Sequence, residues 1–238
     1  MTDAVKKLKE LVDSSNNIVF FGGAGVSTES GIPDFRSTGG LYHQEWKYPP
    51  ETILSHTFYK SKPEEFFRFY RAKMLAPDAR PNAAHFKLAE WEKAGKLKAV
   101  ITQNIDGLHQ AAGSREVLEL HGSVHRNHCE KCGKFYGLDF ILSTRGVPRC
   151  DCGGIVKPDV VLYEESLDQA LLSRSLRYIA EADMLIIGGT SLNVYPAAGL
   201  IQHYAGRKLV LINKGAVARD LTADLVITDP IGEVLSQV

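Results

Sequence analysis

The sequence carries no excess of either charge. Lysine plus arginine and aspartate plus glutamate number 28 each among 238 residues, so the formal net charge is zero. A basic excess draws a domain to nucleic acid or to an anionic membrane, and none is present. We therefore expect neither as a partner, and other partners have to be inferred from individual sites.

The chain also lacks a long apolar run, an internal repeat and a low-complexity tract. No stretch approaches the ~20 apolar residues that span a bilayer, and residues 1–7 contain no apolar segment typical of a secretory signal. Cysteine is scarce, with four residues. From the missing membrane and signal segments we expect a soluble, cytoplasmic protein, and we expect it to be a monomer. A reducing cytosol disfavours disulfides, which bears on the four cysteines.

Five short apolar runs, each ending at a glycine or a polar residue, indicate the fold. They cover residues 18–21, 99–101, 117–120, 184–187 and 209–212. Segments with helical periodicity, at 3–14, 63–74 and 83–94, alternate with them. Continuous apolar runs suit strands buried on both faces of a parallel sheet, and such sheets bind ligands at the carboxyl ends of their strands. The sequence predicts an α/β fold with a site for a large polar ligand, and His121 follows one of the runs.

Two segments interrupt this alternation. Residues 37–60 contain Gly39-Gly40 and Pro49-Pro50 with no clear period, which favours a long functional loop. Residues 125–156 hold all four cysteines and little apolar content, which is typical of an inserted module. The aromatic-rich stretch 63–74 is read as a helix that packs in a core.

The cysteines form two close pairs. Cys129-x2-Cys132 is followed after seventeen residues by Cys150-x-Cys152, and glycines stand directly after both pairs. Thiolates on tight turns surround a tetrahedral zinc ion, and a complete set of four leaves no open position, so we expect one structural zinc ion. Two disulfides or four unrelated thiols are the weaker alternatives, and His121, His125 and His128 lie close enough in sequence to substitute as ligands.

A glycine-rich turn follows the first apolar run. Gly23-Ala-Gly-Val-Ser-Thr28 resembles a dinucleotide fingerprint, in which glycines let the backbone approach a pyrophosphate. Thr28 replaces the third glycine, and no acidic residue ends a second strand about twenty residues later, so an ordinary dehydrogenase is disfavoured. A plain tight turn remains an alternative for the glycines alone.

Longer motifs resemble the sirtuins, NAD-dependent protein lysine deacylases. They are Gly23-Ala-Gly-Val-Ser-Thr-Glu-Ser-Gly-Ile-Pro-Asp-Phe-Arg36, Thr102-Gln-Asn-Ile-Asp-Gly-Leu-His109, Glu119-Leu-His-Gly122, the cysteine pairs, and Gly189-Thr-Ser-Leu192 with Asn213. They stand in the family's order and cover essentially the whole chain. The resemblance implies a Rossmann-like parallel sheet with helices on both faces, a small domain made of a zinc module and a helical insert, and a cleft between them. It also implies that the NAD-binding domain comprises residues 1–36, 81–124 and 157–238, with a cofactor loop and helical insert at 37–80 and the zinc module at 125–156.

The resemblance also implies a reaction. In this family the acyl oxygen of the modified lysine attacks C1′ of the nicotinamide ribose, expels nicotinamide and leaves an alkylimidate. A histidine base then activates a ribose hydroxyl, and the products are free lysine and O-acyl-ADP-ribose. His121 matches that base, and its ordinary pKa near neutrality suits the role. A hydrogen-bonded structural histidine is the alternative.

The resemblance assigns further residues to NAD. Ile105 and Asp106 bind the nicotinamide amide, Asn104 positions the ribose as a catalytic residue, and Gln103 contacts the ribose. The remaining assignments are the phosphate-binding turn (Gly23, Ala24, Thr28), the reacting ribose (Phe35, Arg36), phosphate and ribose contacts (Gly189, Thr190, Ser191), the adenosine ribose (Asn213) and adenine (Ile231). Local capping is the alternative for Asn104, Asp106, Ser191 and Asn213.

An acetyl-lysine peptide is expected to bind as an added strand between residues 160–165 and 192–195. The family usually has Arg-Pro and Phe-Gly-Glu where this chain has Lys157-Pro158 and Tyr163-Glu-Glu165, which leaves the peptide register open. Members that prefer succinyl-lysine carry a tyrosine and, three residues later, an arginine; here these positions are Phe67 and Tyr70, so uncharged acyl groups are expected. Mono-ADP-ribosyl transfer and a non-catalytic NAD or ADP-ribose sensor are the rival functions.

Overall fold

A parallel sheet forms the larger part of the molecule. The computed structural model describes residues 2–35, 40–41, 46–215 and 222–238. In this part of the chain the sheet has six strands in the order β3-β2-β1-β7-β8-β9, and all neighbouring pairs are parallel. The strands are β1 (Ile18–Gly22), β2 (Leu97–Thr102), β3 (Val117–Glu119), β7 (Met184–Gly188), β8 (Leu209–Ile212) and β9 (Leu225–Ile227). The predicted α/β fold is confirmed, and the five predicted strands are all present.

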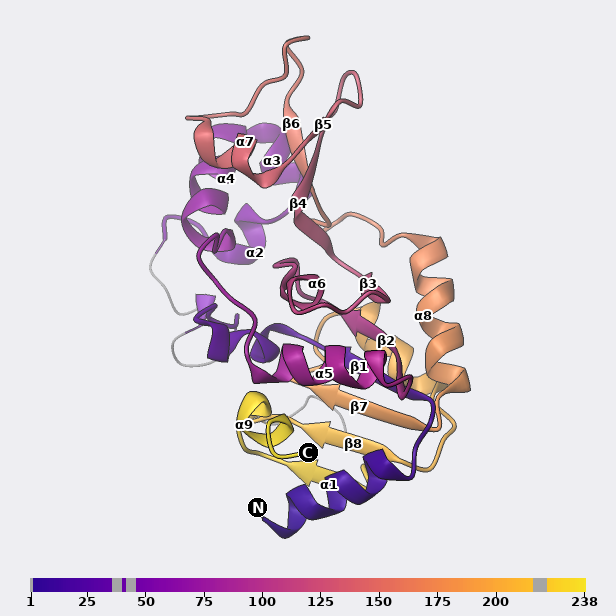
Figure 1. The fold of residues 1–238 in the computed structure, drawn as a ribbon. Helices are drawn as coiled ribbons and strands as arrows, with labels where there is room; N and C mark the ends of the chain where they lie inside the picture. The colour runs from indigo at the N-terminus through magenta and orange to yellow at the C-terminus, as the bar shows by residue number, and fades with distance from the viewer. Residues whose placement is uncertain (1, 36–39, 42–45, 216–221) are drawn as a thin grey trace.

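Helices cover both faces of this sheet (Figure 1). On one face lie α1 (Asp3–Asp13), α5 (Ala83–Lys93) and α9 (Ile231–Leu235). On the other lie α8 (Gln169–Glu181) and the 3₁₀ helix η5 (Ala197–His203). Alternate residues of each strand enter the two cores, as Phe20 does on one side and Phe21 on the other. Both side chains are fully buried, which is why these strands read as unbroken apolar runs.

A smaller domain stands above the carboxyl ends of β1 and β2 (Figure 1). Its antiparallel sheet has the order β5-β4-β6, with β4 (Gly122–Cys129), β5 (Phe135–Tyr136) and β6 (Val156–Val160). Its helices are α2 (Pro50–Ile53), α3 (His56–Ser61), α4 (Pro63–Phe69), the π-helical turn η4 (Tyr70–Met74) and α7 (Leu138–Ser143). Aromatic rings of α3, α4 and η4 pack on Val124, Ile141 and Val156, so these segments share one core.

The prediction of a loop over residues 37–60 was wrong from residue 50 onward. Two short helices, α2 and α3, occupy residues 50–61. The Ser55 hydroxyl accepts the backbone N–H of Phe58 and so caps α3, while Phe58 and Tyr59 enter the core of the small domain. Helices of four and six residues are too short for a period to show in the sequence.

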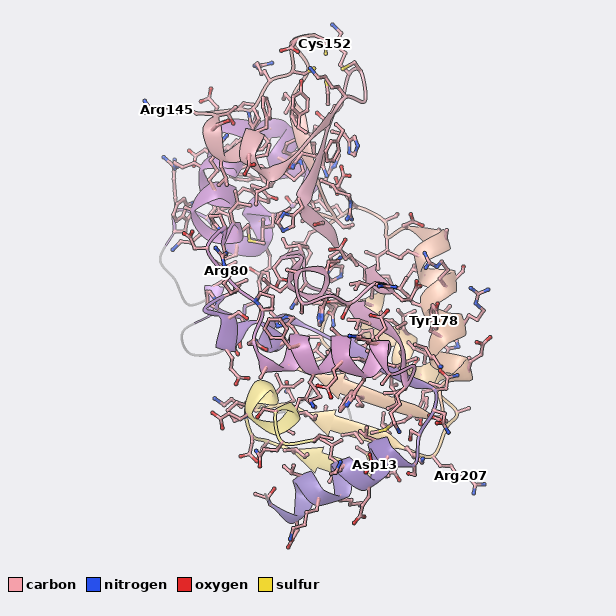
Figure 2. All side chains as sticks on the ribbon, in the orientation of Figure 1. Asp13, Arg80, Arg145, Cys152, Tyr178 and Arg207 are labelled. Atoms are coloured by element: carbon pink, nitrogen blue, oxygen red, sulfur yellow. The ribbon has the colours of Figure 1, made fainter. Side chains whose placement is uncertain are left out.

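Within the described ranges, no helix has the length and apolar character that crossing a membrane requires. Figure 2 shows the side chains on this framework, with Cys152 at the far tip of the small domain and Asp13 and Arg207 at the opposite end of the molecule. Arg80 lies between these extremes, near the junction of the two domains.

Candidate active site

A large cavity lies where the carboxyl ends of the parallel strands meet the small domain. Its volume is about 1500 Å³. Every predicted cofactor residue within the described ranges lines it, namely Gly23, Ala24, Thr28, Phe35, Gln103, Asn104, Ile105, Asp106, His121, Gly189, Thr190, Ser191, Asn213 and Ile231. Arg36 lies outside the described residues. Residues from six separate segments of sequence thus converge on one site, as the polar ends of the apolar runs predicted.

Two glycine turns meet at the floor of the cavity. The turn after β1 continues into the 3₁₀ helices η1 (Ala24–Val26) and η2 (Thr28–Ser30), and Gly31 caps the end of η2. Gly25 donates its N–H to the Gly189 carbonyl at 2.8 Å. A Cβ on Gly25 would lie 2.7 Å from Gly189 Cα, and one on Gly189 would lie 2.3 Å from the Val26 nitrogen. Only glycine permits this approach, which leaves the turn's backbone open toward the cavity.

The Ser27 hydroxyl forms hydrogen bonds with two other polar side chains of the cavity. Its hydroxyl donates to Asp106 Oδ2 at 2.6 Å and accepts from Asn104 Nδ2 at 3.1 Å. Asp106 Oδ1 accepts the N–H of Leu108, at the start of α6 (Leu108–Ala111), at 2.9 Å. Asn104 is itself nearly buried. Both side chains are therefore fixed in orientation before any ligand binds.

His121 lies at the wall between the two sheets, in the two-residue turn that links β3 to β4. Its Nδ1 lies 3.0 Å from the Gln103 carbonyl oxygen. A carbonyl only accepts, so Nδ1 carries the proton and Nε2 is left as the basic nitrogen. Burial lowers the pKa of His121, and the hydrogen bond to Gln103 opposes that change. The imidazole is consequently neutral, and able to take a proton, at physiological pH.

The segment 160–165 forms another wall of the cavity. Val161 donates its N–H to the His121 carbonyl at 3.0 Å, so the wall is attached directly to the histidine. The Lys157 ammonium donates to the carbonyls of Pro158 and Val160 and to the Glu165 carboxylate. The lysine, found where the family usually has arginine, therefore ties both ends of the segment together.

On the opposite side, residues 193–195 line the cavity, whereas Leu192 does not. Leu192 is 1% exposed and packs in the core under α8 and η5. The predicted peptide-facing segment 192–195 thus presents its last three residues to the cavity.

Ser27 and His125 were not selected from the sequence. Ser27 was read only as part of the glycine-rich turn, although its place in that motif next to Thr28 was a usable signal. His125 was weighed only as a metal ligand, but its Nε2 contacts the Asp106 carbonyl oxygen at 2.9 Å. That contact joins β4 to the loop after β2, a pairing that no local sequence pattern reports.

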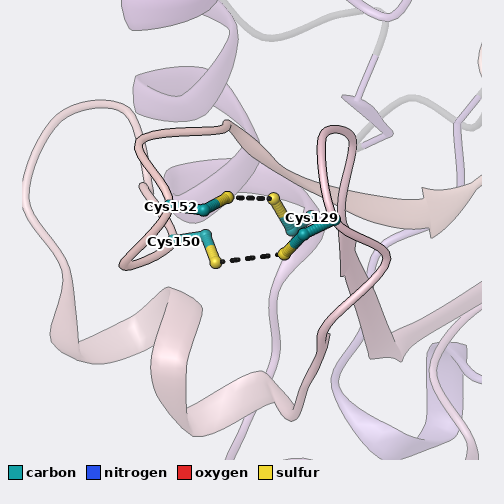
Figure 3. A group of neighbouring side chains, drawn as sticks. Cys129, Cys150 and Cys152 are labelled. Carbon is teal, nitrogen blue, oxygen red and sulfur yellow. Dashed lines mark hydrogen bonds between the residues drawn. The ribbon is translucent and has the colours of Figure 1, made fainter.

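The four cysteines form a separate cluster at the tip of the small domain (Figure 3). All four are free, and their sulfur atoms lie within 4.8 Å of one another. The Sγ–Sγ distances are 3.4 Å for Cys129 and Cys152 and 3.6 Å for Cys132 and Cys150. Zinc–sulfur bonds of about 2.3 Å place tetrahedral sulfurs about 3.8 Å apart, whereas a disulfide needs about 2.05 Å. The cluster fits one zinc ion, and neither disulfides nor histidine ligands are needed to explain it.

Comparison with known proteins agrees with this geometry. A family model described as the Sir2 family matches residues 23–196. A protein of Clostridium acetobutylicum named NAD-dependent protein deacetylase is 61% identical over 242 aligned residues, covering 100% of this chain and 99% of that protein.

Solved structures agree as well. A Sir2 structure with p53 peptide and NAD⁺ superposes with a TM-score of 0.87 at 40% identity, covering 100% of this chain and 97% of that one. Another, described as Sir2 with deacetylated p53 peptide and 3′-O-acetyl ADP ribose, gives a TM-score of 0.90 at 40% identity, covering 98% and 96%.

Proposed function

Because the chain belongs to the Sir2 family, we propose that it is an NAD-dependent protein deacetylase. It transfers the acetyl group of an acetyl-lysine to ADP-ribose and releases nicotinamide, so that NAD is consumed. The observation that carries the proposal is the convergence of the glycine turn, the Asn104–Asp106 pair and His121 on one cavity.

The cavity fits NAD in size, shape and donor chemistry. The adjoining glycine turns at Gly25 and Gly189 leave backbone open where a pyrophosphate needs close approach. Ala24, Thr28, Gly189, Thr190 and Ser191 would hold the phosphates and a ribose. Asn213 and Ile231 would hold the adenosine end, with Gly23, Phe35 and Gln103 around the remaining parts. We propose residues 1–36, 81–124 and 157–238 as the NAD-binding domain, 37–80 as cofactor loop and helical insert and 125–156 as zinc module.

At the nicotinamide end we propose three roles. Asp106 and the backbone of Ile105 accept hydrogen bonds from the carboxamide, and Ser27 keeps the Asp106 carboxylate turned for that purpose. Asn104 orients the ribose that reacts. His121 Nε2 takes a proton from a ribose hydroxyl, because its Nδ1 proton is already committed to Gln103. When bound, NAD would supply an electrophilic C1′, to which the acetyl oxygen would bond as the bond from C1′ to nicotinamide breaks.

We propose that the acetyl-lysine peptide enters as an extended strand between 160–165 and 193–195. Both segments line the same cavity as His121, which supports this placement. We propose that the protein acts as a monomer in the cytoplasm, where free thiols like those of the cysteine cluster persist.

The proposed function is tested by incubating the protein with NAD and an acetylated peptide. We expect nicotinamide release that depends on the acetyl group, with deacetylated peptide and O-acetyl-ADP-ribose by mass spectrometry. The same peptide without the acetyl group is the control. A peptide that gains the mass of ADP-ribose would instead indicate mono-ADP-ribosyl transfer, and NAD binding without nicotinamide release would indicate a sensor.

The acyl pocket is expected to prefer acetyl over succinyl. Phe67 and Tyr70 are fully buried in the aromatic core of the small domain and do not line the cavity. Arg71, one residue from Tyr70, donates hydrogen bonds from its guanidinium to the carbonyls of Ile141 and Gly146. Arg68 forms an ion pair with Glu65. None of these side chains offers a succinyl carboxylate a bidentate partner, and burying an unpaired charge costs several kcal/mol.

We expect kcat/KM for succinyl-peptide to fall at least ~100-fold below that for the acetyl form of the same peptide, because ~2.7 kcal/mol is enough for that ratio. Equal values would contradict the prediction. Lys73 and Arg80 both line the cavity and would then be the candidate cations, and Lys73→Met or Arg80→Met would identify the one responsible by removing the succinyl activity selectively.

A further inference from the structure

The cavity wall at residues 160–165 contains a backbone conformation that residues other than glycine rarely adopt. Glu164 has φ = +76°. In the described residues, Leu192 (φ = +56°) is the only other residue besides glycine with positive φ. Glu164 lies in one of the two segments between which the peptide strand is proposed to bind, and Leu192 directly precedes the other. Such strain persists only where the surroundings enforce it, and it concentrates at functional sites.

The surroundings of Glu164 do enforce it. Its carboxylate oxygen Oε2 accepts the backbone N–H of Thr57 at 2.9 Å and the Thr57 hydroxyl at 2.7 Å. Thr57 lies in the first turn of α3, in the helical insert of the small domain. The exposed carboxylate therefore reaches away from its own backbone and fastens the wall to a helix that is distant in sequence.

The neighbours of Glu164 face the same helix. Tyr163 donates its N–H to the Leu54 carbonyl at 3.0 Å, and its carbonyl accepts the N–H of His56 at 3.0 Å. The Glu165 carboxylate contacts His56 Nδ1 at 2.8 Å. Residues 163–165 of the wall are therefore attached to residues 54–57 by hydrogen bonds.

Glu164 differs from its neighbours in its backbone. Within the described ranges, its N–H and C=O make no hydrogen bond, although the residue lines the cavity. A strand edge with open backbone groups is what an incoming extended peptide pairs with.

We propose that Glu164 is a positioning residue for the acyl-peptide. Its carboxylate, held by both donors of Thr57, keeps the left-handed turn in place, and the turn presents the backbone of Glu164 to the peptide strand. The inference rests on the proposed deacetylase function. It differs from a direct role, in which the Glu164 carboxylate would bind a basic side chain of the substrate.

Alanine and glycine at position 164 separate the two roles. Alanine removes the carboxylate but keeps the strain of positive φ, so the turn relaxes. Glycine also removes the carboxylate but adopts positive φ without strain. A backbone role is therefore lost in Glu164→Ala and recovered in Glu164→Gly, whereas a direct carboxylate role is lost in both.

The experiment measures kcat and KM for an acetyl-peptide and for NAD, together with the Kd of the acetyl-peptide by calorimetry. We expect Glu164→Ala to raise peptide KM and Kd about 10-fold, equivalent to ~1.4 kcal/mol, with kcat and NAD KM within two-fold. Glu164→Gly should stay within about two-fold of the wild type. Thr57→Val, which removes the hydroxyl but keeps the backbone N–H, should give about a three-fold rise. Glu51→Ala, on the exposed side of neighbouring α2, is the matched control and should change nothing.

Equal losses in the alanine and glycine variants would overturn the proposal, and so would an unchanged peptide KM in Glu164→Ala. A loss of kcat in step with thermal stability would also overturn it, since that would mark a merely structural residue. The wild type is measured in the same series: if it fails to deacetylate the peptide, the proposed function itself fails, which is a different result from equal losses in an active series.

Discussion

Replacing His121 by alanine is expected to abolish deacetylation while NAD and acetyl-peptide still bind. The imidazole contacts the Gln103 carbonyl through Nδ1 and leaves Nε2 as the only basic atom of the side chain. Removing a general base typically costs 10²–10⁴-fold in rate. We therefore expect kcat to fall at least ~100-fold, with the Kd for NAD changed by less than about three-fold, as measured by calorimetry.

His203→Ala is the matched control, because His203 is exposed on η5 and does not line the cavity. Near wild-type turnover in His121→Ala would contradict the assigned role. Loss of NAD binding in that variant would show instead that His121 holds the cofactor site together.

The pH dependence of the reaction provides a second test of the role of His121. Burial lowers the pKa of His121 below its ordinary value of 6.5. The base must be neutral, so kcat/KM, which reports groups of the free enzyme, should rise with pH through an acidic limb that lies below pH 6.5 and should be flat at neutrality. An acidic limb centred above pH 7 would contradict this environment for His121.

Removal of zinc is expected to unfold the small domain and abolish activity. One zinc ion per chain should be found by elemental analysis, held by Cys129, Cys132, Cys150 and Cys152. Binding of a structural zinc ion contributes on the order of 10 kcal/mol, and in small modules this is folding free energy. Cys129 and Cys150 also belong to the core that contains the aromatic residues of α4. The damage should therefore extend beyond the cysteine turns to the wall of the active site.

The measurement combines chelator treatment with thermal unfolding and the deacetylation assay. Cys132→Ser should reproduce the effect of the chelator, whereas Ser143→Ala, at an exposed position at the end of α7, should not. Full activity and an unchanged Tm after verified removal of the metal would show that the cluster has no structural role.

The sequence allowed prediction of those parts of the fold that depend on local pattern. Phe20 and Phe21 are buried on opposite faces of the sheet, so the run 18–21 was visible as a buried strand. β9 was not predicted, because its three residues include Val226, which is exposed, and form no distinctive run.

The residues of the candidate site also divide into those that a local sequence pattern predicts and those that it does not. Residues at strand ends, such as His121, could be placed in the cavity because parallel strands bring their carboxyl ends together. The attachment of Tyr163 to Leu54 and His56 joins segments more than a hundred residues apart through backbone hydrogen bonds, which no local sequence pattern reports. For the same reason, Glu164 in place of the usual glycine could be noticed in the sequence, but its partner Thr57 could not.

The shared core of the small domain bears on how such a protein can change over evolutionary time. The domain enters the parallel-sheet framework as two excursions of the chain, one between η2 and α5 and the other between β3 and α8. Phe66, Phe67 and Tyr70 come from the first excursion, and Val124, Ile141 and Val156 come from the second. Deleting either one would expose the apolar surface of the other. We therefore expect the two excursions to change together, because shortening one calls for a compensating change in its counterpart.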